Sequence, residues 1–501
     1  MKKTALILAA ACLALLSCHK ETTPEPQKVP VSTVTLNQTT LALIVGAKEQ
    51  LTATVLPENA TDPNITWSSS APAVATVESG KVTAVAAGSA VISASAGNVK
   101  AQCNVTVVQP SSIKLSFSTP EPDNEAISGA GGSVTVHVTA DDNWTLVSSG
   151  SWLTVTPSSG GAGEITLTLT TQQNATKAVR TGTLSVKENP SLKLEFKQMP
   201  YIYSRKKVAS GTVTNSLLVN YSSGTKLTRV YAFMPVPQSN AYQDISNLSV
   251  GEASIKDCGN NANQYAVADI CSIPSSGGAV LQESFHADAY EVTADVSLVK
   301  EIPEYNTESD IYKLYLGAEE GDLINPSNAQ IVSTADILWS AAGGNLLDYA
   351  RRCYQWTATN MTYGNMNTGL HTITNLMQTR KGDCGNFSSV FISLLRAHGI
   401  PSRHIVMLSP TEAGYHVRAE FYLPGYGWIA ADPTFRNSNP SGDYFGKFTG
   451  KYVVMSFGIN SLCKDPDGKD YRADLLQSCF WWYWYSTQGS ITFKHSFSSF
   501  R

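Results

Sequence analysis

The chain is short of charge, since only 15% of its 501 residues are Asp, Glu, Lys or Arg, against about 25% in average soluble domains. This shortage excludes charged disorder and a coiled coil. The 36 basic and 40 acidic residues also lack the basic excess of a nucleic-acid-binding protein. No EF-hand-like run of Asp and Asn occurs, and no two cysteines have the CxxC spacing of a structural zinc site. We therefore expect no metal, no other cofactor and no nucleic-acid partner.

What the chain has is length and small polar residues. At about 150 residues per domain, 501 residues correspond to three or four domains. Hydrophobic residues make up 42% of the chain, which is enough for several cores. Gly, Ser and Thr are abundant, and this composition favours β-structure in most of the chain.

The first 18 residues have the pattern of an export signal. Lys2 and Lys3 precede an apolar run at 5–16, and the small Ser17 comes before Cys18. A basic start, an apolar stretch and a small residue before the cut are typical of such signals. The run is too short for a transmembrane helix, which needs about 20 apolar residues.

The letters LLSC at 15–18 resemble the bacterial lipoprotein box, which implies lipidation of Cys18 and a membrane anchor. An ordinary secretory signal with an incidental cysteine is the alternative. We expect a lipoprotein signal peptide at 1–18 and a Pro-rich linker at 19–30. The protein would then be exported and lipid-anchored to the cell envelope, at the outer membrane or the cell surface.

Seven cysteines remain once Cys12 and Cys18 are set aside. They are Cys103, Cys258, Cys271, Cys353, Cys384, Cys463 and Cys479. An odd number in an exported chain means at least one free thiol. Cys258 with Cys271, and Cys463 with Cys479, are close enough in sequence to bridge, but spacing alone leaves the connectivity open.

Residues 31–109 alternate with the β-period and carry Gly and Pro at turn positions. The letters NITWSSS at 64–70, VATV at 74–77 and GKVTA at 80–84 resemble a bacterial Ig-like group 2 domain. Trp67 is then a residue of the sandwich core.

Residues 111–200 form a second β-unit, with NWTL at 143–146 and SWLTV at 151–155. The pattern resembles a BACON domain, an Ig-like module proposed to bind carbohydrate or mucin. Trp144 and Trp152 are therefore candidates for stacking on sugar rings, and core packing is the favoured alternative for both.

A third β-sandwich is expected at 201–320, where strand-like segments are broken by prolines and no recognisable chemistry occurs. It should pack on a last domain at 321–501. The aromatic run FWWYWY at 480–485 is either a glycan or peptide platform or, preferably, a strand buried between two layers.

Within 321–501 the hydrophobic period becomes helical. Phe387, Val390, Phe391 and Leu394 lie at i, i+3, i+4 and i+7, which predicts an amphipathic helix. Asp383 is placed to cap its start, so that Cys384 lies in the first helical turn. A thiol at a helix N-terminus ionises more readily, and the thiolate is the nucleophile. A structural buried cysteine is the alternative.

A β-hairpin follows the helix. If Tyr422 pairs with Trp428 across its turn, His416 and Asp432 become diagonal neighbours on one face. A register slip of one residue would separate them. In the predicted register, Asp432 could orient the imidazole and His416 could take the proton of Cys384.

Three motifs occur in this region in the order Cys, His, Asp. They are GDC at 382–384 with LLRAHGIPSR at 394–403, YHV at 415–417 and GWIAADPT at 427–434. Together they resemble the transglutaminase-like superfamily, which has a papain-related α+β fold. The resemblance implies that Cys384 is the nucleophile, His416 the general base and then acid, and Asp432 the orienting carboxylate.

Many members of that superfamily follow the His with Ala-Trp, whereas Val417 and Arg418 stand here. This departure bears on substrate preference more than on the triad. The backbone N–H of Cys384 is one candidate oxyanion donor. The resemblance implies a second, aromatic donor upstream, for which we favour Tyr363. Trp356 and Gln355 are further candidates, and packing on a helix face is the alternative for all three.

The predicted fold class is a multidomain chain in which three all-β Ig-like sandwiches precede an α+β transglutaminase-like, papain-like core. The resemblance implies a cysteine amidase, peptidase or acyltransferase that attacks an amide carbonyl of a protein or peptide and passes through a thioester. The alternative is a non-catalytic surface protein that binds carbohydrate or mucin through the BACON-like domain.

Overall fold

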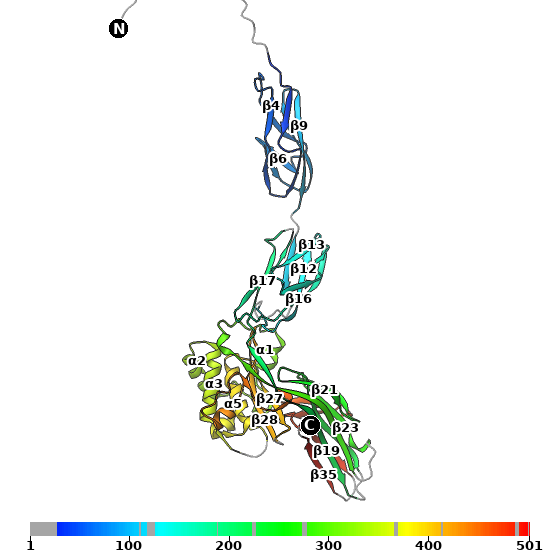
Figure 1. Cartoon of the computed structure of the whole chain (residues 1–501), viewed down its shortest axis with the longest axis vertical. Helices are drawn as coiled ribbons and strands as arrows, with labels where there is room; N and C mark the ends of the chain where they lie inside the picture. Colours follow the sequence, from blue (N-terminus) through cyan, green and yellow to red (C-terminus); the bar gives the residue numbers. More distant parts are fainter. Residues whose placement is uncertain are drawn as a thin grey trace, which may run out of the picture. The chain divides into compact units, whose positions relative to one another are not determined.

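The computed structural model describes most of the chain (Figure 1). The described residues are 28–109, 112–117, 126–187, 189–222, 227–272, 278–364, 369–411, 414–485, 490–498 and 500. The predicted signal peptide and its lipidated Cys18 lie outside these residues. Among the described helices, none has the length and apolar character needed to cross a membrane.

The chain forms two compact units, residues 1–112 and 113–501. The strands of the first unit are β1 (Thr33–Leu36), β2 (Thr40–Ile44), β3 (Lys48–Gln50), β4 (Ala53–Leu56), β5 (Thr66–Ser69), β6 (Ala75–Glu78), β7 (Lys81–Ala84), β8 (Gly88–Ala96) and β9 (Val99–Val108). They form the sheets β2-β9-β8-β5 and β3-β7-β6, with β1 paired to β4. Alternating residues such as Ile92 and Val105 fill the core, and Trp67 packs against them as predicted.

The second unit begins with a sandwich of short strands. These are β10 (Ile113–Phe117), β11 (Ala126–Ile127), β12 (Gly132–Ala140), β13 (Trp144–Ser148), β14 (Leu153–Thr156), β15 (Ser159–Gly160), β16 (Gly163–Thr171), β17 (Arg180–Val186) and β18 (Lys193–Gln198). Trp144 is 2% exposed in its core, and its Nε1 donates to the Gly161 carbonyl at 3.0 Å. Trp152 is partly buried against the same core, with the Arg180 guanidinium 3.9 Å from its ring. Trp144 is thus a core residue, which excludes it as an exposed sugar platform.

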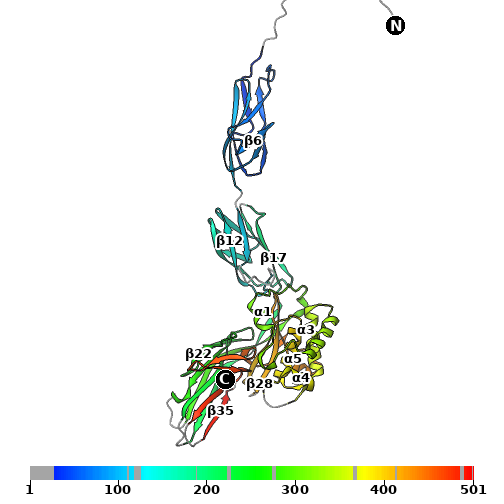
Figure 2. The same cartoon turned by 180° about the vertical axis from the view of Figure 1, so that it is seen from behind.

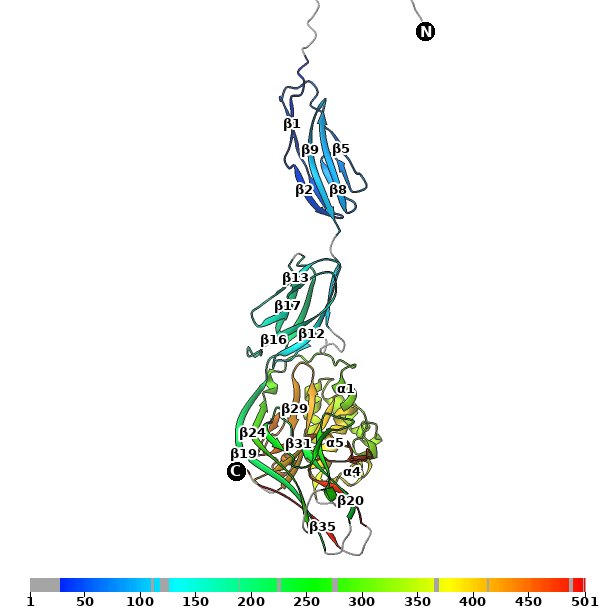
Figure 3. The same cartoon turned by 90° about the vertical axis from the view of Figure 1, so that its right-hand side faces the viewer.

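A third sandwich follows, and its longest strands run together (Figure 3). Its strands are β19 (Tyr203–Tyr221), β20 (Leu227–Val236), β21 (Gln243–Ser249), β22 (Ser254–Asp257), β23 (Gln264–Asp269), β24 (Gly278–Ala294), β34 (Phe480–Tyr485) and β35 (Ile491–Phe497). The sheets are β21-β24-β19-β35 and β22-β23-β20-β34.

The last two strands of the chain therefore complete the third sandwich. The expected division at residue 320 does not hold for them, because β34 pairs with β20 and β35 pairs with β19. Phe480 stacks on Phe233 with ring centroids 4.5 Å apart, and Trp481 stacks on Phe493 at 4.4 Å. These two aromatic residues of the 480–485 run pack within the sandwich, which was the preferred interpretation of that segment.

The α+β core lies between these strands in sequence. Its elements are α1 (Asp310–Tyr315), α2 (Ala329–Ala341), α3 (Leu346–Asn360), β25 (Thr362–Tyr363), α4 (Ile373–Thr379), β26 (Lys381–Gly382), α5 (Cys384–Ala397), β27 (Ser402–Ser409), β28 (Gly414–Leu423), β29 (Gly427–Ala431), α6 (Pro433–Ser438), β30 (Lys447–Phe448), β31 (Val453–Phe457), β32 (Ser461–Lys464) and β33 (Asp470–Ala473). Short 3₁₀ turns occur at Ile270–Ser272, Val296–Leu298 and Glu320–Asp322.

The central sheet of the core has the order β29-β28-β27-β31. Helix α5 packs on β27 and β28, and α2, α3 and α4 pack on α5 (Figures 1 and 2). Apolar residues of α5 such as Phe391 meet Ala419 and Phe421 of β28 in one cluster. Ile405 and Met407 of β27 instead join Val292 of β24 in another cluster. The third sandwich thus packs on the core, as expected.

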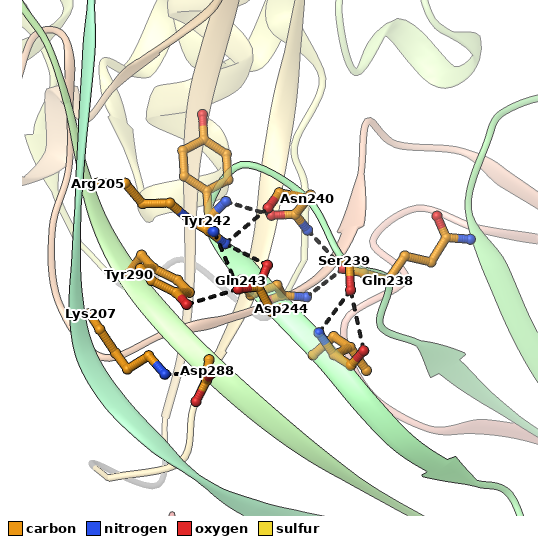
Figure 4. Close-up of polar contacts among 11 residues, drawn as sticks. Arg205, Lys207, Gln238, Ser239, Asn240, Tyr242, Gln243, Asp244, Asp288 and Tyr290 are labelled. Carbon is orange, nitrogen blue, oxygen red and sulfur yellow. Dashed lines mark hydrogen bonds and ion pairs between the residues drawn. The ribbon is translucent and has the colours of Figure 1, made fainter. Parts of the chain in front are cut away.

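Polar side chains before and within β21 contact one another and side chains of β19 and β24 (Figure 4). Two of them also join the sandwich to the core. Gln243 accepts a hydrogen bond from the Val454 N–H at 2.6 Å and donates one to the Val454 carbonyl at 2.8 Å. Tyr242 donates to the buried Glu420 carboxylate at 2.6 Å. Arg205 of β19 pairs across β24 with Asp244 of β21 at 2.8 Å. The two buried contacts fix β31 and β28 against the sandwich.

Candidate active site

The first turn of α5 carries Cys384. Asp383 caps the helix, and its side chain accepts from the Asn386 N–H at 3.2 Å. The helix begins at Cys384 and its apolar residues are fully buried, as the sequence predicted. Cys384 itself is half-buried. The sulfur therefore lies at the positive end of a rigid, buried helix, where the helix dipole favours negative charge.

The hairpin that follows has the predicted register. Tyr422 pairs with Trp428, and the ladder continues to Ala419 opposite Ala431. One step further along this register, Asp432 comes opposite Arg418, so that His416 is its diagonal neighbour. The structure brings the two side chains together, because His416 Nε2 lies 2.7 Å from Asp432 Oδ2.

The Cys384 sulfur also acts on His416, since it is one of the causes that raise the pKa of the imidazole. Since Asp432 occupies Nε2, Nδ1 is the ring nitrogen left for the sulfur. Burial lowers the pKa of His416, but the Asp432 carboxylate and the Cys384 sulfur raise it more, and the resulting value is about 9. An imidazolium that persists above neutral pH is suited to stabilise a thiolate beside it.

Asp432 is fully buried and has three partners. Its Oδ1 accepts from the Phe435 N–H at 2.9 Å, so it also caps α6. Its Oδ2 faces His416 and, at 3.2 Å, the Nε atom of Arg418. Burial raises the pKa of Asp432, but the charges of His416 and Arg418 outweigh that effect and hold it below its ordinary value. The carboxylate is thus kept ionised and oriented.

Arg418 is the site residue whose role the sequence did not reveal. Its side chain is fully buried, and its Nη2 donates to the Thr449 carbonyl at 2.9 Å. Its guanidinium lies 4.7 Å from the Phe448 ring centroid and 5.2 Å from that of Tyr452. The sequence held one signal, since Arg418 stands where many members of the resembled superfamily have Trp.

The imidazole is held by its neighbours. Its ring stacks on Phe435 with centroids 4.6 Å apart and an interplanar angle of 11°. Gln477, from the segment after β33, donates to the His416 carbonyl at 3.1 Å. These contacts restrict the ring to an orientation in which both nitrogens serve the site.

The oxyanion candidates lie beside Cys384 to different degrees. The N–H groups at the start of α5, including that of Cys384, have no acceptor within the helix. Tyr363 lies on β25, which pairs with β26 just before Cys384. Tyr363 is 54% exposed. Its pKa is raised first by burial and second by the charge of Cys384.

Two weaker candidates are on α3. Trp356 carries the Arg380 guanidinium over its ring at 4.6 Å and packs on the helical core. Gln355 is exposed. Of the three candidates, Tyr363 is therefore the one whose pKa responds to Cys384, whereas Trp356 packs on the helical core.

A groove of about 410 Å³ adjoins the start of α5. It is lined by Gly369, Leu370, Tyr471, Arg472, Ala473, Asp474, Leu475, Ser478, Phe480 and Trp481. A Cβ placed on Gly385 would lie 2.8 Å from Leu370 and 3.8 Å from Leu475. Leu370 and Leu475 of the groove thus lie against Gly385, the residue that follows Cys384.

Within the described residues, no group of three or more His, Cys, Asp or Glu side chains is placed to hold a metal ion. The described residues bring together a sulfur, an imidazole and a carboxylate at the N-terminus of α5. Such an arrangement can generate a thiolate and return a proton to a leaving group.

Three family models match successive segments of the chain. Residues 30–107 match the bacterial Ig-like domain (group 2), residues 108–193 the viral BACON domain, and residues 338–433 the transglutaminase-like superfamily. These matches confirm the three recognised modules and, with the structure, the predicted fold class.

An uncharacterised protein of Haemophilus influenzae is 32% identical over an alignment of 116 positions, which covers 18% of this chain and 31% of that protein. The chain thus spans less than a third of the length of this curated relative. A candidate cysteine protease of Cytophaga hutchinsonii aligns with 59% of this chain and 93% of its own, at 13% identity and a TM-score of 0.39. The periplasmic domain of TgpA from Pseudomonas aeruginosa aligns with 45% of this chain and 89% of its own, at 14% identity and a TM-score of 0.26.

Proposed function

We propose that this protein is a cysteine amidase, peptidase or acyltransferase that acts on protein or peptide substrates at the cell envelope. One observation carries the proposal: His416 Nε2 lies 2.7 Å from the buried Asp432, and the sulfur of Cys384, at the N-terminus of α5, raises the pKa of the same imidazole. The transglutaminase-like match over 338–433 includes Cys384, His416 and Asp432.

The chemistry follows from these three groups. His416 accepts the thiol proton, and the Cys384 thiolate attacks an amide carbonyl. The Cys384 N–H stabilises the tetrahedral oxyanion, with Tyr363 as second donor. His416 then protonates the leaving amine, and a thioester remains on Cys384. Water releases an acid, whereas an amine releases a new amide.

The groove beside Gly385 supports a peptide as substrate. The groove has apolar lining residues in Leu370, Leu475 and Trp481, and charged lining residues in Arg472 and Asp474. A polypeptide lying in it would present apolar side chains to the wall and its carbonyls to the sulfur. The front modules would serve as spacers between the lipid anchor on Cys18 and the enzyme.

The testing experiment compares the native chain with Cys384→Ala. Both are incubated with a library of Gln-containing peptides, with and without an added primary amine, and the products are read by mass spectrometry. Loss of ammonia or chain cleavage by the native protein alone supports the proposal, and the amine arm separates hydrolysis from transamidation. Identical spectra for the two proteins across the library would overturn it.

A matched Cys271→Ala variant controls for the loss of a thiol as such. Cys271 is exposed and follows β23 in the third sandwich, away from α5 in sequence. The Cys271→Ala variant should process the same peptides as the native chain. Equal loss in both variants would assign the activity to something other than Cys384.

A further inference from the structure

Two cysteines that are far apart in sequence meet in the structure. Cys258 follows β22, and Cys463 lies in β32. Both are buried, with 7% and 0% exposure, in one apolar cluster with Phe233 and Tyr265. The interaction between the two thiols is the largest cause that lowers the pKa of Cys258 and raises that of Cys463. Sequence spacing had offered Cys271 and Cys479 as their partners instead.

The backbone holds the two sulfurs in place. The N–H of Gly259, the residue after Cys258, donates to the carbonyl of Leu462, the residue before Cys463, at 2.9 Å. Asn260 accepts from the Leu462 N–H at 2.8 Å and donates to the Asn460 carbonyl at 2.7 Å. These hydrogen bonds place the two cysteine-bearing segments side by side, which is the arrangement that a disulfide between them requires. The pair can therefore be joined with little movement of the main chain.

We propose that Cys258 and Cys463 form a disulfide when the protein folds in an oxidising compartment. The bond would tie the third sandwich to β32, which is followed by β33 and the segment at 474–479. That segment forms a wall of the groove at Leu475 and holds the His416 carbonyl through Gln477. This inference does not depend on catalysis by Cys384, which stays free.

The reaction is thiol–disulfide exchange with a small-molecule or protein disulfide. The interaction with Cys463 holds the pKa of Cys258 below its ordinary value, and burial opposes this effect. The Cys258 thiolate attacks the oxidant, breaks its S–S bond and releases one thiolate. Cys463 then gives up its proton, attacks the Cys258 sulfur and releases the second thiol. The two cysteines lose two electrons, and the oxidant is reduced to two thiols.

The experiment uses the full chain secreted into an oxidising periplasm. Free thiols are blocked with N-ethylmaleimide under denaturing conditions, and digests are compared with and without reductant. We expect one linked peptide pair containing Cys258 and Cys463, two hydrogens lighter than the sum of the reduced peptides. Cys103 and Cys353, which are buried elsewhere, should be fully blocked.

Matched variants test whether the bond contributes to stability. The variants Cys258→Ser and Cys463→Ser should each lose the linked peptide pair. Without reductant their thermal midpoints should be lower than that of the native protein, and with reductant this difference should disappear. Cys271→Ser should leave both unchanged. The proposal is wrong if Cys258 and Cys463 remain fully blocked after secretion and after exposure to oxidised glutathione. It is also wrong if Cys258 links to Cys271 or Cys463 to Cys479.

Discussion

Asp432 and Arg418 form a buried ion pair directly behind the candidate catalytic imidazole. Asp432 Oδ2 lies 3.2 Å from Arg418 Nε and 2.7 Å from His416 Nε2, so one carboxylate oxygen faces two basic groups. In this arrangement the guanidinium and the imidazolium compete for the same negative charge. Changes at the two residues should therefore move the His416 titration in opposite directions.

Asp432→Asn should lower the pKa of His416 from about 9. The carboxylate favours the imidazolium, and its loss leaves burial, which disfavours charge. We expect the midpoint to fall by more than about 1 pH unit, the scale of effect of a nearby opposite charge. NMR titration of the His416 ring protons in isotopically labelled protein measures it, with Cys384→Ser as reference. An unchanged midpoint would show that Asp432 does not set the charge of His416.

Arg418→Met should raise the pKa of His416, because it removes a competing cation while keeping much of the side-chain volume. The variant should also lose about 3 kcal/mol of stability, since breaking a buried ion pair leaves Asp432 with fewer partners. The same NMR titration and a urea denaturation measure the two effects. A lower midpoint in Arg418→Met than in the native protein would contradict the shared-carboxylate arrangement.

Glu283→Gln should change how stability depends on pH. Glu283 is fully buried, its Oε1 accepts from Asn215 at 2.8 Å, and burial raises its pKa to about 8. Between the ordinary value of 4.5 and this value, the unfolded chain releases the proton while the folded one keeps it. Native stability should therefore fall as pH rises from 4.5 to 8, by up to about 5 kcal/mol.

The Gln side chain cannot ionise, so this part of the decline should be absent in Glu283→Gln. Denaturation at a series of pH values between 5 and 9 checks it, with the exposed Glu304→Gln as control. Parallel stability curves for native protein and Glu283→Gln would show that Glu283 is not held protonated.

Trp144→Ala should destabilise the second sandwich by about 3–5 kcal/mol, the cost of removing a large buried aromatic side chain. The Gly161 carbonyl also loses its donor. Trp152→Ala should cost less, because Trp152 is only partly buried. Denaturation of both variants, followed by tryptophan fluorescence, compares them. If Trp144→Ala unfolds no more readily than Trp152→Ala, the assignment of Trp144 to the core fails.

The local geometry of the site could be predicted from the sequence. Asp383, with the apolar spacing after Cys384, fixed the start of α5, because capping and helical periodicity act over a few residues. The alternation in β28 and the length of its turn fixed the register that makes His416 and Asp432 neighbours. Each of these signals is short-range.

The long-range features could not be read in this way. Strands β34 and β35 return to the third sandwich from the end of the chain, and no local pattern encodes the partner of a strand. The approach of Cys258 to Cys463 depends on the docking of two distant segments. The Arg418–Asp432 pair lies one step beyond the last paired residues of the hairpin, so its contact depends on the packing of Phe448 and Tyr452 around the guanidinium.

The central claim is tested most directly by the rate at which iodoacetamide alkylates each cysteine of the native protein near neutral pH. Cys384 should react faster than Cys271, although Cys271 is more exposed. Burial and Asp269 raise the pKa of Cys271, whereas Cys384 has His416 as a base to take up its proton. In His416→Ala the Cys384 rate should fall by about tenfold or more, a loss of about 1.4 kcal/mol, while the Cys271 rate stays the same. Slow alkylation of Cys384, equal to that of Cys271 and unchanged in His416→Ala, would contradict the account.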